Sequence, residues 1–299
     1  MLTIFAMPKP FEGHIATIQR NAITSWTLLN PRPEIILFGE ENGVSEIARE
    51  LGLRHIPKVN RNEYGTPLLN DLFDSAQNLA VNSIVCYVNA DIVLLSDFMA
   101  AVKQIVSWRP RFLMIGRRWD VDITEPLNFS QAGWELSLRS LVLQRAVQRT
   151  PDWIDYFVFP RSFYKGLAPF AIGRLWWDNW LVWKAFSLGA AVVDASSDIL
   201  AVHQNHSYAR GSTYSDVWVS EEAQRNRELA GMGLSVCTMA DATHVLAEHE
   251  IKPNRGSAIR RMLRGIWRAV LSVTRPLRHS LGLHQKGVSS LLAKLGMPR

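Results

Sequence analysis

The chain has 299 residues, of which 47% are hydrophobic and 20% charged, so it can bury the core of one large α/β domain or of two small ones. Its two cysteines, Cys86 and Cys237, lie far apart, which excludes a disulfide framework or a zinc site and predicts reduced thiols in the cytoplasm. The first residues lack the features of a signal peptide, and no run of about 20 apolar residues occurs, so we expect no membrane span.

The formal net charge of +6 is distributed unevenly. After Glu250 there is no acidic residue, whereas eleven Lys and Arg follow it. The preceding 250 residues therefore carry 22 basic and 27 acidic side chains. This asymmetry concerns the partners of the protein and says little about its fold.

The first 95 residues alternate apolar runs with segments of helical periodicity. We expect strands over 2–7, 34–38, 54–59 and 83–88, separated by helices over 14–29, 45–51 and 68–80. Four strands separated by helices favour a doubly wound, mostly parallel sheet with helices on both faces. Ligands bind such sheets at the carboxyl ends of the strands.

The second half continues the pattern less regularly. We expect helices over 97–108 and 134–148, strands over 112–116, 152–160 and 190–195, and a helix beyond Glu221. The segment 119–123 alternates like an exposed strand face. Trp176, Trp180 and Trp183 recur at helical spacing, which predicts one apolar helix face packed in the core.

The most apolar strand ends at Asn89-Ala90-Asp91. A buried carboxylate there must face a cation, a donor or water. This strand end resembles the acidic motif of the GT-A glycosyltransferases, a strand ending in Asp-x-Asp or a reduced version of it, with Asn89 here in the first position. The resemblance implies that Asp91 holds a divalent metal, Mn²⁺ or Mg²⁺, which bridges the diphosphate of a nucleotide-sugar. The alternative is an Asp that caps the next turn.

The same resemblance implies a nucleotide-binding role for the other strand ends. The residues concerned are Pro8, Lys9, Gly39, Glu40, Gly65, Thr66, Pro67, Asn89 and Arg117. No Gly-x-Gly-x-x-Gly or Walker sequence occurs, so dinucleotide and P-loop sites are unexpected. Arg117 and Arg118 could reach a diphosphate, or could form salt bridges with Asp120 or Asp122. Asp120-Val121-Asp122 also spells Asp-x-Asp, but we favour Asp91 because the strand before it is more apolar.

Two further acidic residues are candidates for catalysis. Asp155 lies in the strand predicted over 152–160 and either touches a donor or acceptor sugar or caps a turn. Asp178, in Trp-Asp-Asn-Trp, resembles the general base of inverting GT-A enzymes, although Trp177 replaces the Glu usual before it. The alternative is an Asp stabilised by the N-terminus of a helix.

His203 and His206 lie three residues apart at the end of an apolar run. Imidazole is a common metal ligand, and several GT-A families place a late histidine on the metal, so either residue could fill that position. The loop 209–216 follows, and its Gly211-Ser212-Thr213 could close over the donor.

From Ile259, apolar residues share one helical face and arginines occupy the rest, as in a helix lying on anionic lipid. Nucleic acid is the competing partner for these basic residues. Binding to a nucleic-acid duplex would not require the apolar face, so we favour the membrane and expect no nucleic-acid ligand. We expect the hinge at 253–256 to separate this tail from the body.

The sequence thus predicts a GT-A-like catalytic domain over 1–252, with a nucleotide-sugar-binding half over 1–125 and an acceptor half over 126–252. A basic amphipathic helical tail over 253–299 would attach it peripherally to the inner face of the membrane. The expected activity is metal-dependent transfer of a sugar from a nucleotide-sugar to a lipid-linked or cell-surface polysaccharide acceptor. The alternative is a non-catalytic, membrane-associated scaffold with the same fold.

Overall fold

The computed structural model describes residues 1–206, 218–262 and 265–266. The loop predicted over 209–216 and most of the predicted tail lie outside these residues. The chain divides into two units, Met1–Pro253 and Asn254–Arg299, each described here by itself. Among the described residues, no helix has the length and apolar character needed to cross a bilayer.

The first half of the chain forms the predicted parallel strands. They are β1 (Leu2–Ala6), β2 (Glu34–Phe38), β3 (Arg54–Ile56) and β4 (Ile84–Val88), separated by α1 (Gly13–Thr27), α2 (Val44–Leu51) and α3 (Leu69–Leu79). β1 pairs in parallel with both β2 and β4, and β2 pairs in parallel with β3. The predicted mostly parallel, doubly wound sheet is therefore confirmed for this half.

The second half extends this sheet to nine strands. It adds β6 (Phe112–Ile115), β9 (Tyr156–Pro160), β10 (Ala191–Asp194), β12 (His244–Ala247) and β13 (Glu250–Pro253), in the order β13-β12-β10-β6-β9-β4-β1-β2-β3. β9 is antiparallel to both of its neighbours, and the edge strand β13 is antiparallel to β12. The remaining pairs in this half, β6–β10 and β10–β12, are parallel.

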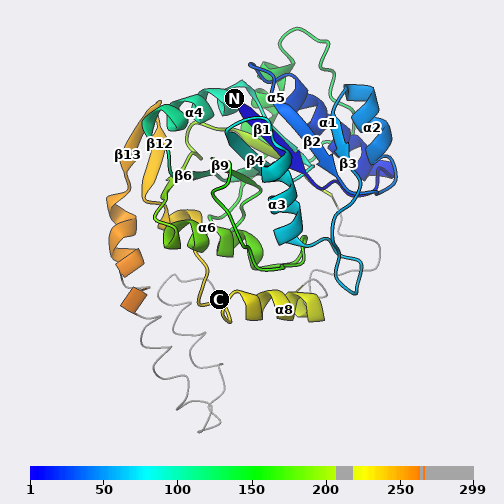
Figure 1. The fold of residues 1–299 in the computed structure, drawn as a ribbon. Helices are drawn as coiled ribbons and strands as arrows, with labels where there is room; N and C mark the ends of the chain where they lie inside the picture. Colours follow the sequence, from blue (N-terminus) through cyan, green and yellow to red (C-terminus); the bar gives the residue numbers. More distant parts are fainter. Residues whose placement is uncertain (207–217, 263–264, 267–299) are drawn as a thin grey trace. The chain divides into compact units, whose positions relative to one another are not determined.

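Helices cover both faces of the sheet, as predicted (Figure 1). α1, α2, α4 (Ser96–Trp108) and α5 (Trp134–Arg145) contribute to one apolar cluster. α3 and α6 (Trp177–Ser187) contribute to the other. On this second side Phe5, Phe73, Tyr87 and Phe159 pack ring against ring, with centroids 5.1 to 6.5 Å apart. These contacts fix β1, β4 and β9 relative to one another, and so fix where the strands end.

A second, four-stranded sheet was not predicted. It consists of β5 (Ile92–Val93), β11 (Ala201–Gln204), β7 (Arg118–Val121) and β8 (Val147–Gln148), in that order. The helix expected over 134–148 therefore ends at Arg145. The exposed strand face expected over 119–123 is wrong, because Asp120 and Val121 are only 5% and 2% exposed. The alternation is present, but the sheet is covered on both sides.

Three other expectations need correction. α8 (Glu221–Leu229) is present as predicted, but the polar segment after it forms the β12–β13 hairpin. The charged residues of this hairpin are typical of an edge strand, and the hairpin therefore lacks the apolar run by which strands are predicted. Pro253, expected in a hinge, is the last residue of β13. In the tryptophan stripe, Trp176 precedes α6 instead of lying on its core face, and Trp177 is buried with Trp180.

In the second unit, residues 255–262 and 265–266 are helical. Ile259, Met262 and Ile266 are 64%, 60% and 55% exposed.

Gly116, directly after β6, gives a test of the core next to the site. A Cβ at this position would lie 2.0 Å from the hydroxyl oxygen of Tyr156. That side chain is 1% exposed, and its hydroxyl has no hydrogen-bonding partner among the described residues. We expect Gly116→Ala to lower the free energy of unfolding by about 1–3 kcal/mol, because a filled core must rearrange. Urea unfolding measures the change.

Tyr156→Phe is the matched partner variant, since it removes the atom that meets the new methyl group. The Gly116→Ala/Tyr156→Phe double variant should recover part of the lost stability. Equal losses in both backgrounds would show that the hydroxyl is not the source of the cost.

Candidate active site

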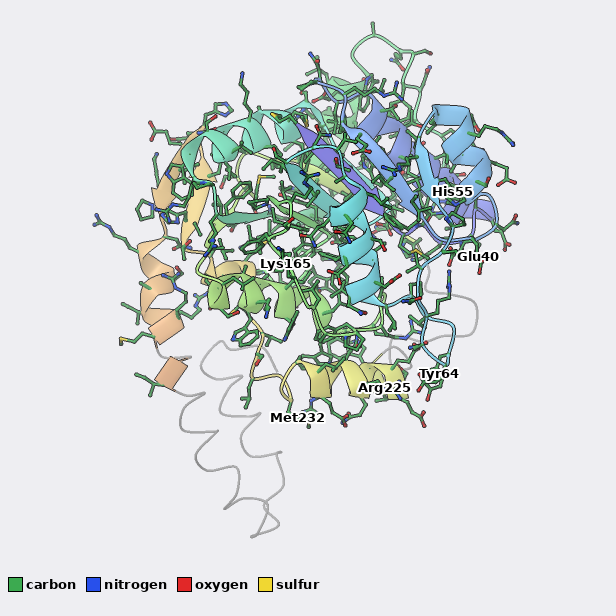
Figure 2. The ribbon with its side chains drawn as sticks, in the orientation of Figure 1. Glu40, His55, Tyr64, Lys165, Arg225 and Met232 are labelled. Carbon is green, nitrogen blue, oxygen red and sulfur yellow. The ribbon has the colours of Figure 1, made fainter. Side chains whose placement is uncertain are left out.

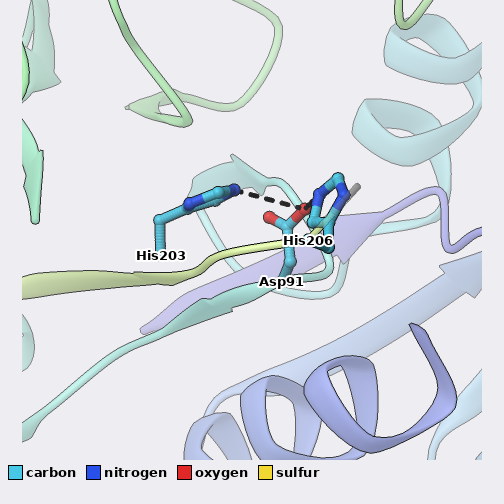
Figure 3. A group of neighbouring side chains, drawn as sticks. All are labelled: Asp91, His203 and His206. Carbon is cyan, nitrogen blue, oxygen red and sulfur yellow. Dashed lines mark hydrogen bonds and ion pairs between the residues drawn. The ribbon is translucent and has the colours of Figure 1, made fainter. Parts of the chain in front are cut away.

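Three side chains from two distant parts of the chain meet at the carboxyl end of β4. Asp91 lies in the turn between β4 and β5, His203 is in β11, and His206 follows that strand. Because β11 is antiparallel to β5, with His203 opposite Ile92, the histidines are brought beside Asp91 (Figure 3). Nε2 of His206 lies 3.1 Å from Oδ2 of Asp91, and Nε2 of His203 lies 3.9 Å from the same oxygen.

These residues fit a divalent cation. One ligand atom from each side chain lies within 4.8 Å of the others. The second oxygen of Asp91, Oδ1, is buried with no hydrogen-bonding partner among the described residues. Carboxylate oxygens suit Mn²⁺, and imidazole nitrogens bind divalent transition metals in general. The sequence left open which histidine joins Asp91, and both lie within reach of it.

The charge of Asp91 is maintained by its neighbours. Burial by itself raises the pKa of this carboxyl, but the hydrogen bond with His206 and the electrostatic interactions with His203 and Lys9 outweigh it and hold the pKa well below its usual range. Asp91 is therefore ionised at neutral pH, the state that a metal ligand requires. Lys9, a predicted donor-binding residue after β1, places Nζ 3.5 Å from Nε2 of His206.

A fully buried glutamine, which the sequence reading missed, anchors this cluster. The side-chain amide of Gln204 donates to the carbonyls of Asp91 (3.1 Å) and Ile18 (2.8 Å). Asn21 of α1 donates in turn to Oε1 of Gln204 at 2.9 Å. The backbone of the candidate metal ligand is thus tied to both α1 and β11. Gln204 follows His203 directly, but nothing in the local pattern indicates which carbonyls it reaches.

Asn89 turns away from this cluster and contacts Asp155. Its amide donates to Oδ1 of Asp155 at 2.5 Å, and its backbone N–H donates to the carbonyl of Asp155 at 2.9 Å. The hydroxyl of Tyr87 donates to Oδ1 of Asn89. An Asp at position 89 would set a second carboxylate against Asp155, so the pairing gives a physical reason for the amide.

Arg118 joins Asp155 to Asp120. Its Nη1 contacts both oxygens of Asp155, at 2.9 and 3.0 Å, and its Nε contacts Oδ1 of Asp120 at 2.8 Å. All three side chains are buried. The salt-bridge interpretation of Arg118 is therefore confirmed, and both oxygens of Asp155 are engaged by protein groups. Arg117 instead directs its backbone N–H to Ser196, and its contact with a donor stays a prediction.

Asp178 lies in the first turn of α6, where Oδ1 accepts the N–H of Asn179 at 2.8 Å. It is partly buried, and burial together with the negative charge of Asp155 raises its pKa to about 6. Trp176, which lies two residues earlier and directly before α6, has a positive φ of 86°. Such conformations cost free energy and occur where the surroundings hold a residue in a special position. Asp178 is thus both a helix-terminal carboxylate and a group suited to accept a proton near neutral pH.

The loops that follow β2 and β3 contact each other near the carboxyl ends of these strands. Arg61 binds Glu41 at 2.6 Å and the carbonyl of Gly65 at 2.9 Å, which connects two of the predicted nucleotide-binding segments. Gly39 has φ 100°, and a Cβ there would lie 2.1 Å from Oε2 of Glu41, so a glycine is required. That Glu41 oxygen is buried without a partner among the described residues. The neighbouring Glu40, a predicted donor-binding residue, is exposed (Figure 2), and its contact with a donor stays a prediction.

α8 holds the loop that carries Gly65, Thr66 and Pro67. Tyr64 donates to Glu221, and Arg225 pairs with Glu63 at 2.6 Å. Glu222 accepts a hydrogen bond from Asn62 at 2.7 Å and pairs with Arg174 at 2.6 Å. α8 thus links this loop to the segment that precedes α6.

The sequence matches no protein-family model, and no curated protein matches it. Solved structures do resemble the fold. GalNAc-T7 with UDP, GalNAc and Mn²⁺ superposes with a TM-score of 0.50 at 15% identity, over 77% of this chain and 48% of that one. Residues 1–349 of S. aureus TarS in complex with UDP-GlcNAc give 0.51 at 14% identity, over 79% of this chain and 67% of that one. The chain spans about half the length of the GalNAc-T7 chain. The predicted resemblance is confirmed at the level of the fold: the protein has the GT-A glycosyltransferase fold.

Replacing the central carboxylate tests the metal-binding cluster. Asp91→Asn removes the negative charge while keeping the side chain's shape, so we expect Mn²⁺ affinity to fall at least about 100-fold, no less than the loss of an outer-shell partner costs. Calorimetric titration of the protein with Mn²⁺ measures the change. Asp122→Asn is the matched control, because Asp122 belongs to the competing Asp-x-Asp motif and is exposed. A larger loss in the control than in Asp91→Asn would place the metal at the other motif.

Proposed function

We propose that the protein is a metal-dependent glycosyltransferase that uses a nucleotide-sugar donor. The observation that carries this proposal is the cluster of Asp91, His203 and His206 at the end of β4 in a GT-A fold. The two structural neighbours support it, since one contains UDP, GalNAc and Mn²⁺ and the other UDP-GlcNAc. In this proposal the donor diphosphate lies between the cluster and the loops that end β1, β2 and β3.

The bound metal would neutralise the negative charge that develops on the leaving diphosphate. Asp91, His203 and His206 would hold it, and Lys9 would add a second positive charge at the same end of the site. Lys9 is well suited to this because α1 fixes its backbone: its N–H donates to Gln19 at 2.7 Å, and its carbonyl accepts from Gln19 at 2.8 Å. A lysine backbone held at both groups restricts where the ammonium can reach.

Asp178 is the proposed general base of an inverting reaction. The acceptor hydroxyl would give its proton to the Asp178 carboxylate while its oxygen bonds to the anomeric carbon and the bond from that carbon to the diphosphate breaks. With a pKa of about 6, Asp178 is mostly ionised at neutral pH and still basic enough to share a proton in the transition state. A retaining enzyme would not require this role, so a test of Asp178 distinguishes an inverting from a retaining mechanism.

We also propose that the acceptor is lipid-linked or part of a cell-surface polysaccharide, and that the protein acts at the inner face of the membrane. The support is the acid-free segment after Glu250, with its eleven basic residues. In the described part of that segment, Ile259, Met262 and Ile266 expose more than half of their surface. Exposed apolar side chains among arginines are typical of helices at anionic lipid surfaces.

A thermal-shift screen tests the core of the proposal. Nucleotide-sugars with different bases and sugars are added with and without Mn²⁺, and a donor should raise the unfolding temperature mainly when Mn²⁺ is present. Ligand at 100 times its dissociation constant contributes about 2.7 kcal/mol to stability. If no nucleotide-sugar stabilises the protein under either condition, the scaffold interpretation replaces the enzyme.

Asp178→Asn should separate chemistry from binding. With a donor found in the screen, we expect turnover to fall by at least about 100-fold while donor affinity is retained, because the amide cannot accept the proton. In the parent protein, turnover should rise with pH through about 6 as the carboxyl loses its proton. Initial rates from pH 5 to 8 measure this rise. Full activity of Asp178→Asn would assign Asp178 to the helix terminus alone and favour a retaining mechanism.

Removal of the basic segment should abolish membrane attachment and leave the fold intact. A chain that ends at Pro253 retains β13 and therefore the whole sheet. We expect it to be folded but absent from pelleted anionic liposomes, whereas the full chain pellets. Each basic residue near anionic lipid contributes about 1 kcal/mol, and salt weakens this term.

Liposomes of neutral lipid are the control, and they should retain much less of the full chain. Pelleting of the truncated protein would move the membrane contact to the first unit, and its unfolding would show that the removed residues stabilise that unit.

A further inference from the structure

His203 lies between two carboxylates that face its two ring nitrogens. The parallel pairing of β7 with β11 sets His203 beside Asp120 in the register. Nδ1 of His203 is 3.3 Å from Oδ1 of Asp120, and Nε2 is 3.9 Å from Oδ2 of Asp91. His203 and Asp120 are 7% and 5% exposed. Nδ1 of His203 is buried and makes no hydrogen bond with the described residues, and the Asp120 carboxylate is the acceptor that lies within 3.3 Å of it.

The state of the ring decides whether it can bind a metal. A neutral imidazole carries one proton, and a cation bound at Nε2 requires that proton to be on Nδ1. Metal-binding histidines usually donate the other N–H to a carboxylate, a carbonyl or water, which fixes both the tautomer and the ring orientation. Asp120 occupies the place of that carboxylate.

Asp120 is itself held in place. Nε of Arg118 contacts Oδ1 at 2.8 Å, and Nε of Arg149 contacts Oδ2 at 2.5 Å. The ring of Trp153 lies against both guanidinium groups, 4.7 and 5.1 Å from its centroid. These contacts keep the carboxylate ionised and oriented although it is buried.

We propose that Asp120 is a positioning residue, which fixes His203 as the Nδ1–H tautomer so that Nε2 is directed into the metal-binding cluster. This inference rests on the metal site of the proposed function. It also assigns a role to the second Asp-x-Asp sequence, because its first residue, Asp120, orients the ligand His203 and does not itself bind the metal.

The first test uses the unaltered protein. Long-range proton–nitrogen NMR of ¹⁵N-labelled protein without metal, at a pH where the imidazoles are neutral, distinguishes the two tautomers. The chain has eight histidines, and the signal lost in His203→Gln identifies the one of interest. The inference expects the proton on Nδ1. A proton on Nε2 would overturn it, whatever the variants show.

The second test compares two variants by Mn²⁺ titration without nucleotide. Asp120→Asn keeps the side chain's shape but can donate to Nδ1, which favours the wrong tautomer, so we expect affinity to fall about 10- to 100-fold. Arg149→Gln is the matched comparison, because it removes the ion pair at Oδ2 of Asp120 while the contacts of Oδ1 with Arg118 and His203 remain, so its Mn²⁺ affinity should fall much less than that of Asp120→Asn. Thermal unfolding of each variant verifies that it is folded; should Asp120→Asn fail to fold, the NMR result decides.

The outcomes separate this inference from the proposed function. Parent-like affinity in folded Asp120→Asn overturns the inference and leaves the metal site in place. An equal loss in Arg149→Gln also overturns it, since the ion-pair network and not the His203 contact would then matter. Absence of Mn²⁺ binding by the parent protein overturns the proposed metal site and the inference with it.

Discussion

The arrangement of the site depends on the burial of one carboxylate, Asp91, at the end of β4. A buried negative charge is costly unless positive groups or donors surround it. Here the compensation comes from β11 and the residues after it, which are more than 100 positions away in the sequence. The pairing of β11 with β5, and the amide contacts of Gln204 with the Asp91 backbone, bring these parts together. The small sheet therefore supplies the polar side chains that surround Asp91 at the end of β4 in the large sheet.

Behind this cluster lies a row of buried charges, Asp120, Arg118 and Asp155. Such pairs seldom add much stability, because desolvation offsets their attraction, but removal of one partner leaves an uncompensated charge. Their geometry is specific: Arg118 binds both carboxylates, and Asn89 completes the hydrogen bonding of Asp155. These three residues thus connect the histidine side of the site to the start of β9. We infer that these buried charges position the residues around them, including His203 beside Asp120, which apolar side chains could not do.

The departure of Asn89 from the Asp-x-Asp pattern has a local explanation in these contacts. In the sequence, Asn89 could suggest a lost metal ligand and hence a non-catalytic scaffold. In the structure, its amide hydrogen-bonds to Asp155, whereas Asp91 and two histidines bring three candidate ligand atoms within 4.8 Å of one another without it. The raised pKa of Asp178 at the start of α6 is a second feature that a scaffold has no need of. Both observations support the enzymatic proposal.

Much of the first half of the fold could be predicted from the sequence alone. Apolar runs alternate with helical periodicity up to β4, and these are local properties of the chain. The same local signal identified Asp91, because a carboxylate directly follows the most apolar strand. His203 and His206 were also found, from two imidazoles close together after an apolar run.

Only the tertiary structure decided the rest, because strand pairing over long distances leaves little local trace. The register of β11 on β7 makes Asp120 a neighbour of His203, although its alternating sequence suggested an exposed face. The charged edge hairpin β12–β13 was missed for the same reason. The sequence by itself determined which residues can do chemistry at the strand ends. The tertiary structure decided which of them meet, since contacts between distant segments depend on how the whole sheet packs.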